Sequence, residues 1–238
     1  MKIALVLRSG GDYTPADVQW LVNQLPKGYE VICLTNMKNM VIPGVKCIPL
    51  LHKWNYCPGW WAKIELFRPD IKDDLLYLDL DTVITGDITD LLENPPKKFT
   101  MLRDFYHPQY FASSIMWIPN KSKGKIWKAF WSDPDGWISS CVTTDCWGDQ
   151  GFISKVMGEN TQAFNDLYPE WFKSYKADIA KLGENVYASP RYSKGNGKLP
   201  AGCRVVVFHG KPRPRTVSEP WIPGSPLYIT GVLEQESA

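Results

Sequence analysis

The sequence is poor in the residues that build metal clusters and disulfide frameworks. It has six cysteines and three histidines among 238 residues, and no two cysteines form a Cys-x-x-Cys pair. Cysteines scattered in this way indicate neither a structural zinc site nor a dense disulfide framework. We therefore expect most of them to be small buried apolar side chains in a reducing, cytoplasmic setting.

Long hydrophobic runs are also missing. The first apolar run, Ile3–Leu7, is too short for the core of a signal peptide and is followed directly by Arg8. No other stretch approaches the roughly 20 apolar residues that a membrane-spanning helix needs. We expect a protein without a transmembrane segment.

Neither sign of charge is in large excess. The formal net charge is +2, from 27 basic and 25 acidic residues, which argues against a protein that binds nucleic acid mainly by electrostatic attraction. The hydrophobic share of 44% is ordinary for a globular protein. The length suffices for one large domain with a proper core, so we predict a single domain over residues 1–238, with a Pro-rich tail from about Lys211.

The order of the first elements is typical of an α/β fold. Strands are expected at Ile3–Leu7, Glu30–Leu34 and Lys46–Leu50, with a helix that starts at Thr14-Pro15 and ends near Pro26. Threonine is a common N-cap, and proline is favoured at the first helical position. This β-α-β start predicts a mostly parallel, Rossmann-like central sheet flanked by helices.

Mixed elements follow in the rest of the chain. In order, we expect a helical segment at Trp60–Phe67, strands at Phe99–Leu102 and Phe111–Ile118, helices at about Ser122–Trp131 and Gly148–Met157, and a late buried strand at Arg204–Phe208. Beyond Lys211 the chain is rich in proline and loses its periodicity. An irregular C-terminal part is therefore expected.

The most informative stretch is Leu75–Asp81, an apolar run that ends in two carboxylates. Side chains alternate along an extended strand, so Asp79 and Asp81 are expected to point into one site. Ligands of open α/β sheets bind at the carboxyl ends of the strands. Two acids there can hold a hard divalent cation, with substrate phosphates completing its shell. This is the chemistry that activates a sugar nucleotide.

An Asp-x-Asp pair is common by chance and often lies in a solvated turn. Here a buried strand precedes the pair, and Thr82–Asp87 follows it as an extended segment and turn. Context of this kind favours a metal site over a chance match.

Short motifs occur in a fixed order on both sides of this stretch. The first is an acidic residue and a tyrosine after the first strand, and the last is a histidine followed by Lys-Pro. They are Asp12-Tyr13, Trp61–Leu66, Tyr77–Asp81, Gly86–Leu91, Tyr110–Met116, Asp149-Gln150 and Phe208–Pro212.

In this order the motifs resemble those of the GT-A glycosyltransferases, in particular the family-8 type that includes glycogenin and lipopolysaccharide galactosyltransferases. The resemblance covers about residues 3–212, and Tyr77–Asp81 is its most specific part. It implies a GT-A-like fold and metal-dependent transfer of a sugar from a nucleotide-diphosphate sugar, with retention of anomeric configuration. The donor implied first is a UDP-sugar. The cofactor would be Mn²⁺ or Mg²⁺, and the acceptor a hydroxyl group of a carbohydrate, a glycolipid or another compound.

The resemblance also implies catalytic and metal-binding residues. Asp79, Asp81 and His209 would hold the metal, and imidazole suits manganese among the hard cations. Asp149 and Gln150 would lie beside the reacting sugar.

Further residues would bind the donor. Asp12 and Tyr13 would contact the nucleotide, with Tyr13 stacking on the base, and Asp79 would also lie near the ribose. Lys63 would occupy the place of a donor-site arginine. The charge of the diphosphate would be neutralised by Lys211, together with Arg213 or Arg215.

Three positions depart from the family pattern. Lys63 stands where the family has an arginine, and a lysine keeps the charge but loses the bidentate fork. Ala112 stands where the family has a sugar-contacting asparagine, which leaves Ser113 or Ser114 as substitutes. The spacing from His209 to Lys-Pro is shorter than in the family.

Two other functions fit parts of the sequence. The same donor chemistry could act on a modified base in DNA, as in phage genome glycosylation, and this would need a basic groove. The basic stretch is Lys121, Lys123, Lys125 and Lys128, and salt-sensitive DNA binding would support this alternative. The other alternative is a catalytically silent module that binds a nucleotide or sugar, which should turn over no donor.

Overall fold

A seven-stranded sheet forms the centre of the computed structural model, which describes residues 1–183 and 191–224. The strand order is β10-β6-β7-β4-β1-β2-β3. Only β7 runs antiparallel to its neighbours in this sheet. This confirms the predicted α/β class with a mostly parallel sheet. The strands are β1 (Lys2–Leu7), β2 (Val31–Thr35), β3 (Val45–Pro49), β4 (Leu75–Leu78), β6 (Thr100–Arg103), β7 (Phe111–Ile118) and β10 (Gln162–Ala163).

Each face of this sheet packs against its own hydrophobic core. In β4, Leu76 and Leu78 belong to one core, while Leu75 and Tyr77 belong to the other. Alternate residues of a strand point to opposite faces, so a central strand that is buried on both sides is apolar at every position. This is why Leu75–Leu78 carries no charged side chain before the two aspartates.

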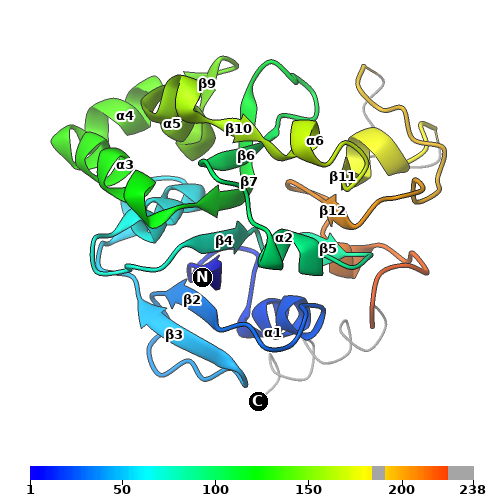
Figure 1. The fold of residues 1–238 in the computed structure, drawn as a ribbon, viewed down its shortest axis with the longest axis horizontal. Helices are drawn as coiled ribbons and strands as arrows, with labels where there is room; N and C mark the ends of the chain where they lie inside the picture. The colour runs from blue at the N-terminus through cyan, green and yellow to red at the C-terminus, as the bar shows by residue number, and fades with distance from the viewer. Residues whose placement is uncertain (184–190, 225–238) are drawn as a thin grey trace.

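Different elements cover the two faces (Figure 1). One face packs against α1 (Pro15–Asn23), α2 (Thr89–Glu93) and a second, smaller sheet. The other face packs against the 3₁₀ segment η2 (Gly59–Phe67) and the helices α3 (Asn120–Ser132) and α5 (Gly148–Met157).

Helix α1 begins as predicted and ends earlier than predicted. Thr14 is its N-cap and Pro15 its first residue, and the Asp17 carboxylate accepts a hydrogen bond from the Thr14 backbone N–H at 2.6 Å. The helix stops at Asn23, before the expected end near Pro26. The helical segment predicted at Trp60–Phe67 is present as η2, with 3₁₀ rather than α geometry.

The late strand predicted at Arg204–Phe208 is confirmed as β12 (Val205–Val207), but it belongs to the smaller sheet. There β12 lies between β11 (Phe172–Ser174) and β5 (Thr82–Ile84), parallel to β11 and antiparallel to β5. Since β5 follows the Asp-x-Asp segment directly, this pairing brings the end of β12 next to the two aspartates.

Several short elements were not predicted, because a segment of two to seven residues has too little periodicity to reveal its type. Besides α2, β10 and β11, they are η1 (Trp54–Tyr56), α4 (Pro134–Ser140), the hairpin of β8 (Val142–Thr143) and β9 (Cys146–Trp147), η3 (Gly158–Asn160), α6 (Phe164–Leu167), the π-helical turn η4 (Tyr175–Ile179) and η5 (Pro214–Thr216). Beyond β12 the described chain is irregular apart from η5, as predicted. In the described ranges no helix is both long and apolar enough to cross a bilayer.

Candidate functional site

A cavity of about 510 Å³ opens where β1 and β4 end. These strands are parallel neighbours, so their carboxyl ends meet at one edge of the sheet, where open α/β sheets bind ligands. The lining contains all of the predicted site residues except Lys211 and Arg215, namely Asp12, Tyr13, Lys63, Asp79, Asp81, Ser113, Ser114, Asp149, Gln150, His209 and Arg213. Arg215 instead donates to Asp17 at 2.6 Å.

The two aspartates of the central motif line the cavity from a turn after β4. The strand ends at Leu78, and the Thr82 N–H donates to the Asp79 carbonyl at 3.2 Å. Asp81 is almost fully buried. Burial and the neighbouring Asp79 carboxylate raise the pKa of Asp81, because both disfavour a second negative charge.

A buried lysine joins two carboxylates on one side of the site. Lys63 Nζ lies 3.1 Å from Asp79 Oδ1 and 3.6 Å from Asp149 Oδ2. Ser113 completes the cluster, because its hydroxyl accepts from Lys63 at 3.1 Å and donates to Asp149 at 2.6 Å. Burial alone would lower the pKa of Lys63, but the charges of Asp149 and Asp79 outweigh it and raise that pKa. Lys63 is therefore a fixed cation.

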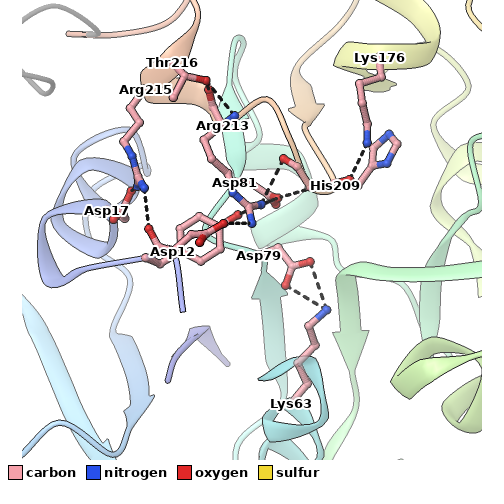
Figure 2. A network of polar contacts seen from close by, with 12 residues as sticks. Asp12, Asp17, Lys63, Asp79, Asp81, Lys176, His209, Arg213, Arg215 and Thr216 are labelled. Carbon is pink, nitrogen blue, oxygen red and sulfur yellow. Dashed lines mark hydrogen bonds and ion pairs between the residues drawn. The ribbon is translucent and has the colours of Figure 1, made fainter. Parts of the chain in front are cut away.

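Arg213 occupies the other side of Asp81. Figure 2 shows its guanidinium between Asp12 and Asp81, with Lys63 on the far side of Asp79. Arg213 Nη1 donates to Asp81 Oδ2 at 3.0 Å and Nη2 to Asp12 Oδ2 at 2.9 Å. The Tyr13 hydroxyl donates to the same Asp81 oxygen at 2.9 Å, and the guanidinium lies 4.5 Å from the centre of the Tyr13 ring. One face of Tyr13, predicted to stack on a base, is thus covered by Arg213.

His209 lines the cavity but points its ring toward other partners. Its Nε2 lies 2.6 Å from Ser174 Oγ, and its ring stacks on Phe105 at 5.5 Å between centroids. Burial, and then the charge of Lys176, lower the pKa of His209 to about 3. The imidazole is therefore neutral at physiological pH, as a metal ligand has to be.

Of the two remaining predicted residues, Gln150 lies in the cavity and Lys211 lies outside it. Gln150 lines the cavity, with its amide nitrogen 3.5 Å from Asp104 Oδ2. Lys211 is exposed and lies outside the cavity lining, whereas Arg213, two residues further on, is part of it.

Solved structures with a similar backbone are found at low sequence identity. Galactosyltransferase LgtC, in complex with donor and acceptor sugar analogs, superposes with a TM-score of 0.61 at 13% identity, over 97% of this chain and 94% of that chain. The apo form of the glycosyltransferase GlyE of Streptococcus pneumoniae gives 0.54 at 16% identity, over 97% and 60%. Mouse xyloside xylosyltransferase 1 gives 0.50 at 11% identity, over 87% and 97%.

The chain has a GT-A-like fold. The resemblance that the motifs indicated is thereby confirmed at the level of the fold. No protein-family model matches the sequence, and no curated protein matches it.

A GT-A fold of this type implies a divalent cation, and the aspartate pair suits one. Asp81 Oδ1 is buried and has no hydrogen-bond partner among the described residues, and Asp79 faces the same cavity. His209 does not fit as it stands, because its Nε2 faces Ser174. Across residues 1–183 and 191–224, no three His, Cys, Asp or Glu side chains form a metal-binding group. His209 as the third ligand stays a prediction.

Three groups in or beside this cavity were not predicted from the sequence. Arg8 follows β1 and lines the cavity; a charged residue at the end of a buried strand was the available signal. The Tyr77 hydroxyl donates to Asp79, and Lys176 donates to the His209 carbonyl at 2.9 Å. Nothing local in the sequence relates Lys176 to His209, because the π-helical turn that carries it was not predictable.

Proposed function

We propose that the protein is a glycosyltransferase that moves a sugar from a nucleotide-diphosphate sugar to an acceptor hydroxyl. A UDP-sugar is the first candidate for the donor. The observation that carries this proposal is the convergence of Asp12, Asp79, Asp81 and Asp149 on one cavity at the carboxyl ends of β1 and β4. The similarity of the whole fold to LgtC supports it.

In this proposal the donor lies across the end of β1. Asp12 and Tyr13 bind the nucleotide part, and Arg213 contributes positive charge to the diphosphate. We assign this role to Arg213 in place of Lys211, because Arg213 lines the cavity and Lys211 does not. A fixed guanidinium suits phosphate oxygens because its fork can donate two parallel hydrogen bonds.

Asp79 and Asp81 would hold a Mn²⁺ or Mg²⁺ ion, with His209 as the predicted third ligand. Such an ion supplies Lewis-acid stabilisation to a leaving diphosphate. The chain's own part is to present Asp81 Oδ1 unpaired and to keep His209 neutral.

The transfer breaks the bond between the anomeric carbon and the diphosphate oxygen and forms a bond to the acceptor oxygen, whose proton goes to the leaving phosphate. Arg213 would offset the negative charge that develops there. Lys63 holds Asp79 and Asp149 in place, and Asp149 and Gln150 would orient the sugar. Retention of configuration is part of this proposal and comes from the resemblance.

The DNA-glycosylating alternative has less support from the predicted basic stretch. Lys123 is buried and donates to the carbonyl oxygens of Ile71 and Asp73 at 2.7 and 2.6 Å. Lys121, Lys125 and Lys128 are exposed. One of the four lysines therefore stabilises the fold and is unavailable to a phosphate backbone.

Donor turnover separates an enzyme from a silent binding module. The purified chain with Mn²⁺ is incubated with UDP-glucose and UDP-galactose, and released UDP is measured by chromatography. We expect slow hydrolysis without an acceptor, and loss of at least about 100-fold in Asp81→Asn. Binding of UDP without any release of UDP from either sugar nucleotide, with or without a panel of glycosides, would favour the silent module. A cytoplasmic, reducing compartment is also proposed, since the cysteines are scattered along the sequence without a Cys-x-x-Cys pair or a dense disulfide framework.

A further inference from the structure

Two tryptophans stand out by their exposure. The sequence has eleven tryptophans, and nine of them are buried or half-buried. Trp60 and Trp147 are 43% and 52% exposed. A large apolar side chain exposed beside a cavity is more informative than one exposed alone, because such surfaces mark ligand grooves.

Both residues line the cavity, and both belong to segments that carry site residues. Trp60 lies at the start of η2, which also holds Lys63. Trp147 directly precedes α5, which holds Asp149. Lys63 and Asp149 are in contact, and Trp60 Nε1 lies against Gly148 at the start of α5, so the two segments that carry the tryptophans meet at the Lys63–Asp149 pair.

Gly148 leaves room for the Trp60 indole. Its φ is +54°, and a Cβ at this position would lie only 2.7 Å from Trp60 Nε1. Trp60 therefore packs against the backbone of Gly148, the residue that follows Trp147 in the sequence. Within the described ranges neither indole packs against another aromatic ring, whereas Trp54 and Trp61 contact Phe130 in the core.

We propose that Trp60 and Trp147 form the acceptor subsite, which takes a neutral pyranose ring of a carbohydrate acceptor. The negative face of an indole attracts the weakly positive C–H groups of a sugar ring, and its N–H can donate to a hydroxyl. The position next to Lys63 and Asp149 places an acceptor hydroxyl beside the reacting sugar. This inference rests on the proposed function.

The charges around the cavity favour a neutral carbohydrate over a nucleic acid. Lys63 and Arg213 are each paired with carboxylates, and Arg8 donates to the Trp54 carbonyl. Single-stranded nucleic acids also stack on aromatic side chains, but their binding needs cations that follow the phosphate backbone. In this lining Lys63 and Arg213 alternate with the carboxylates of Asp79 and Asp81, so they can meet a single diphosphate but do not form a continuous positive track for a phosphate backbone.

Saturation-transfer difference NMR on the full chain tests the subsite. The probes are methyl β-D-glucopyranoside, methyl β-D-galactopyranoside, UDP with Mn²⁺, and a ten-residue oligothymidylate. We expect transfer to the ring protons of at least one glycoside. Its affinity should fall about threefold to tenfold in Trp60→Ala and in Trp147→Ala, with UDP affinity unchanged. Trp147→Phe, which keeps an aromatic face, should recover most of the glycoside signal.

Tyr56→Ala is the matched control, because Tyr56 is 56% exposed and lies outside the cavity lining. It should bind both probes as the natural chain does. The inference is overturned if Trp60→Ala and Trp147→Ala bind the glycoside normally. It is also overturned if the natural chain binds UDP but neither glycoside, or if it binds the oligothymidylate instead. Failure to bind UDP as well would count against the proposed function itself.

Discussion

Arg213 and Lys211 differ in what they can reach, although they are two residues apart. Arg213 contacts Asp12 and Asp81, while Lys211 is exposed. The chain turns between His209 and Arg213, where His209 has a φ of 36° and Gly210 one of 106°. The Arg213 side chain folds back over this turn, since its Nη1 donates to the Gly210 carbonyl at 3.2 Å.

The substitution Arg213→Ala should weaken UDP binding by about tenfold or more, because a charge-assisted hydrogen bond contributes more than about 1.4 kcal/mol. Lys211→Ala, the matched control, should change it by less than about twofold. Isothermal titration calorimetry with Mn²⁺ present measures both. Equal losses in the two variants would return the diphosphate role to Lys211.

The buried Lys123 should make the free energy of unfolding depend on pH. Burial lowers its pKa to about 8, although Asp73, Asp74 and Asp70 oppose this shift. Between pH 8 and the unfolded value of 10.5, the unfolded chain binds a proton that the folded chain has released, so stability rises with pH in this window. Relative to Lys123→Met, the natural chain should gain on the order of 3 kcal/mol from pH 8 to 10.5.

Urea unfolding at several pH values measures this difference. Lys125→Met, on an exposed lysine of the same helix, should run parallel to the natural chain. A constant difference between the natural chain and Lys123→Met across the window would show that the buried ammonium does not titrate there.

At the level of elements, α5 depends on close contact with the hairpin before it. A Cβ on Gly151 would lie 2.6 Å from the backbone carbonyl carbon of Cys146. In α3, a Cβ on Gly124 would meet no atom within 4 Å. Both glycines are inside helices, so the two positions differ mainly in the space around them.

Gly151→Ala should therefore destabilise the protein by about 1–3 kcal/mol, because the gain in helix propensity is outweighed by overpacking. Gly124→Ala should stabilise it by about 0.5–1 kcal/mol. Urea unfolding at neutral pH compares them. Stabilisation by both substitutions would mean that the hairpin moves away from α5 at little cost.

The elements show where sequence reasoning succeeds. Helix α5 and strand β7 have the predicted bounds, and α3 starts two residues before the predicted Ser122, because each is long enough to show its period. Thr14-Pro15 predicted the start of helix α1 correctly, but the end of this helix has no comparable sequence signal. The β8–β9 hairpin was missed although it positions Trp147, since strands of two residues show no alternation.

At the scale of the whole molecule, the sheet and its ligand edge were predictable from sequence. Continuous apolar runs indicate strands buried on both faces, and an acid at the end of such a run marks the edge. Side-chain pairing was not predictable. The contacts of Arg213 with Asp12, or of His209 with Ser174, join residues 201 and 35 positions apart. That residues 1–238 form one domain stays a prediction.

The central claim is that the cavity binds a nucleotide diphosphate with a divalent cation. The most direct test is the melting temperature of the full chain with UDP and with GDP, each with and without Mn²⁺. A ligand at 100 times its dissociation constant adds about 2.7 kcal/mol to stability. The account predicts a rise of several degrees with UDP that requires Mn²⁺ and is lost in Asp81→Asn. An unchanged melting temperature with both nucleotides, Mn²⁺ present, would contradict it.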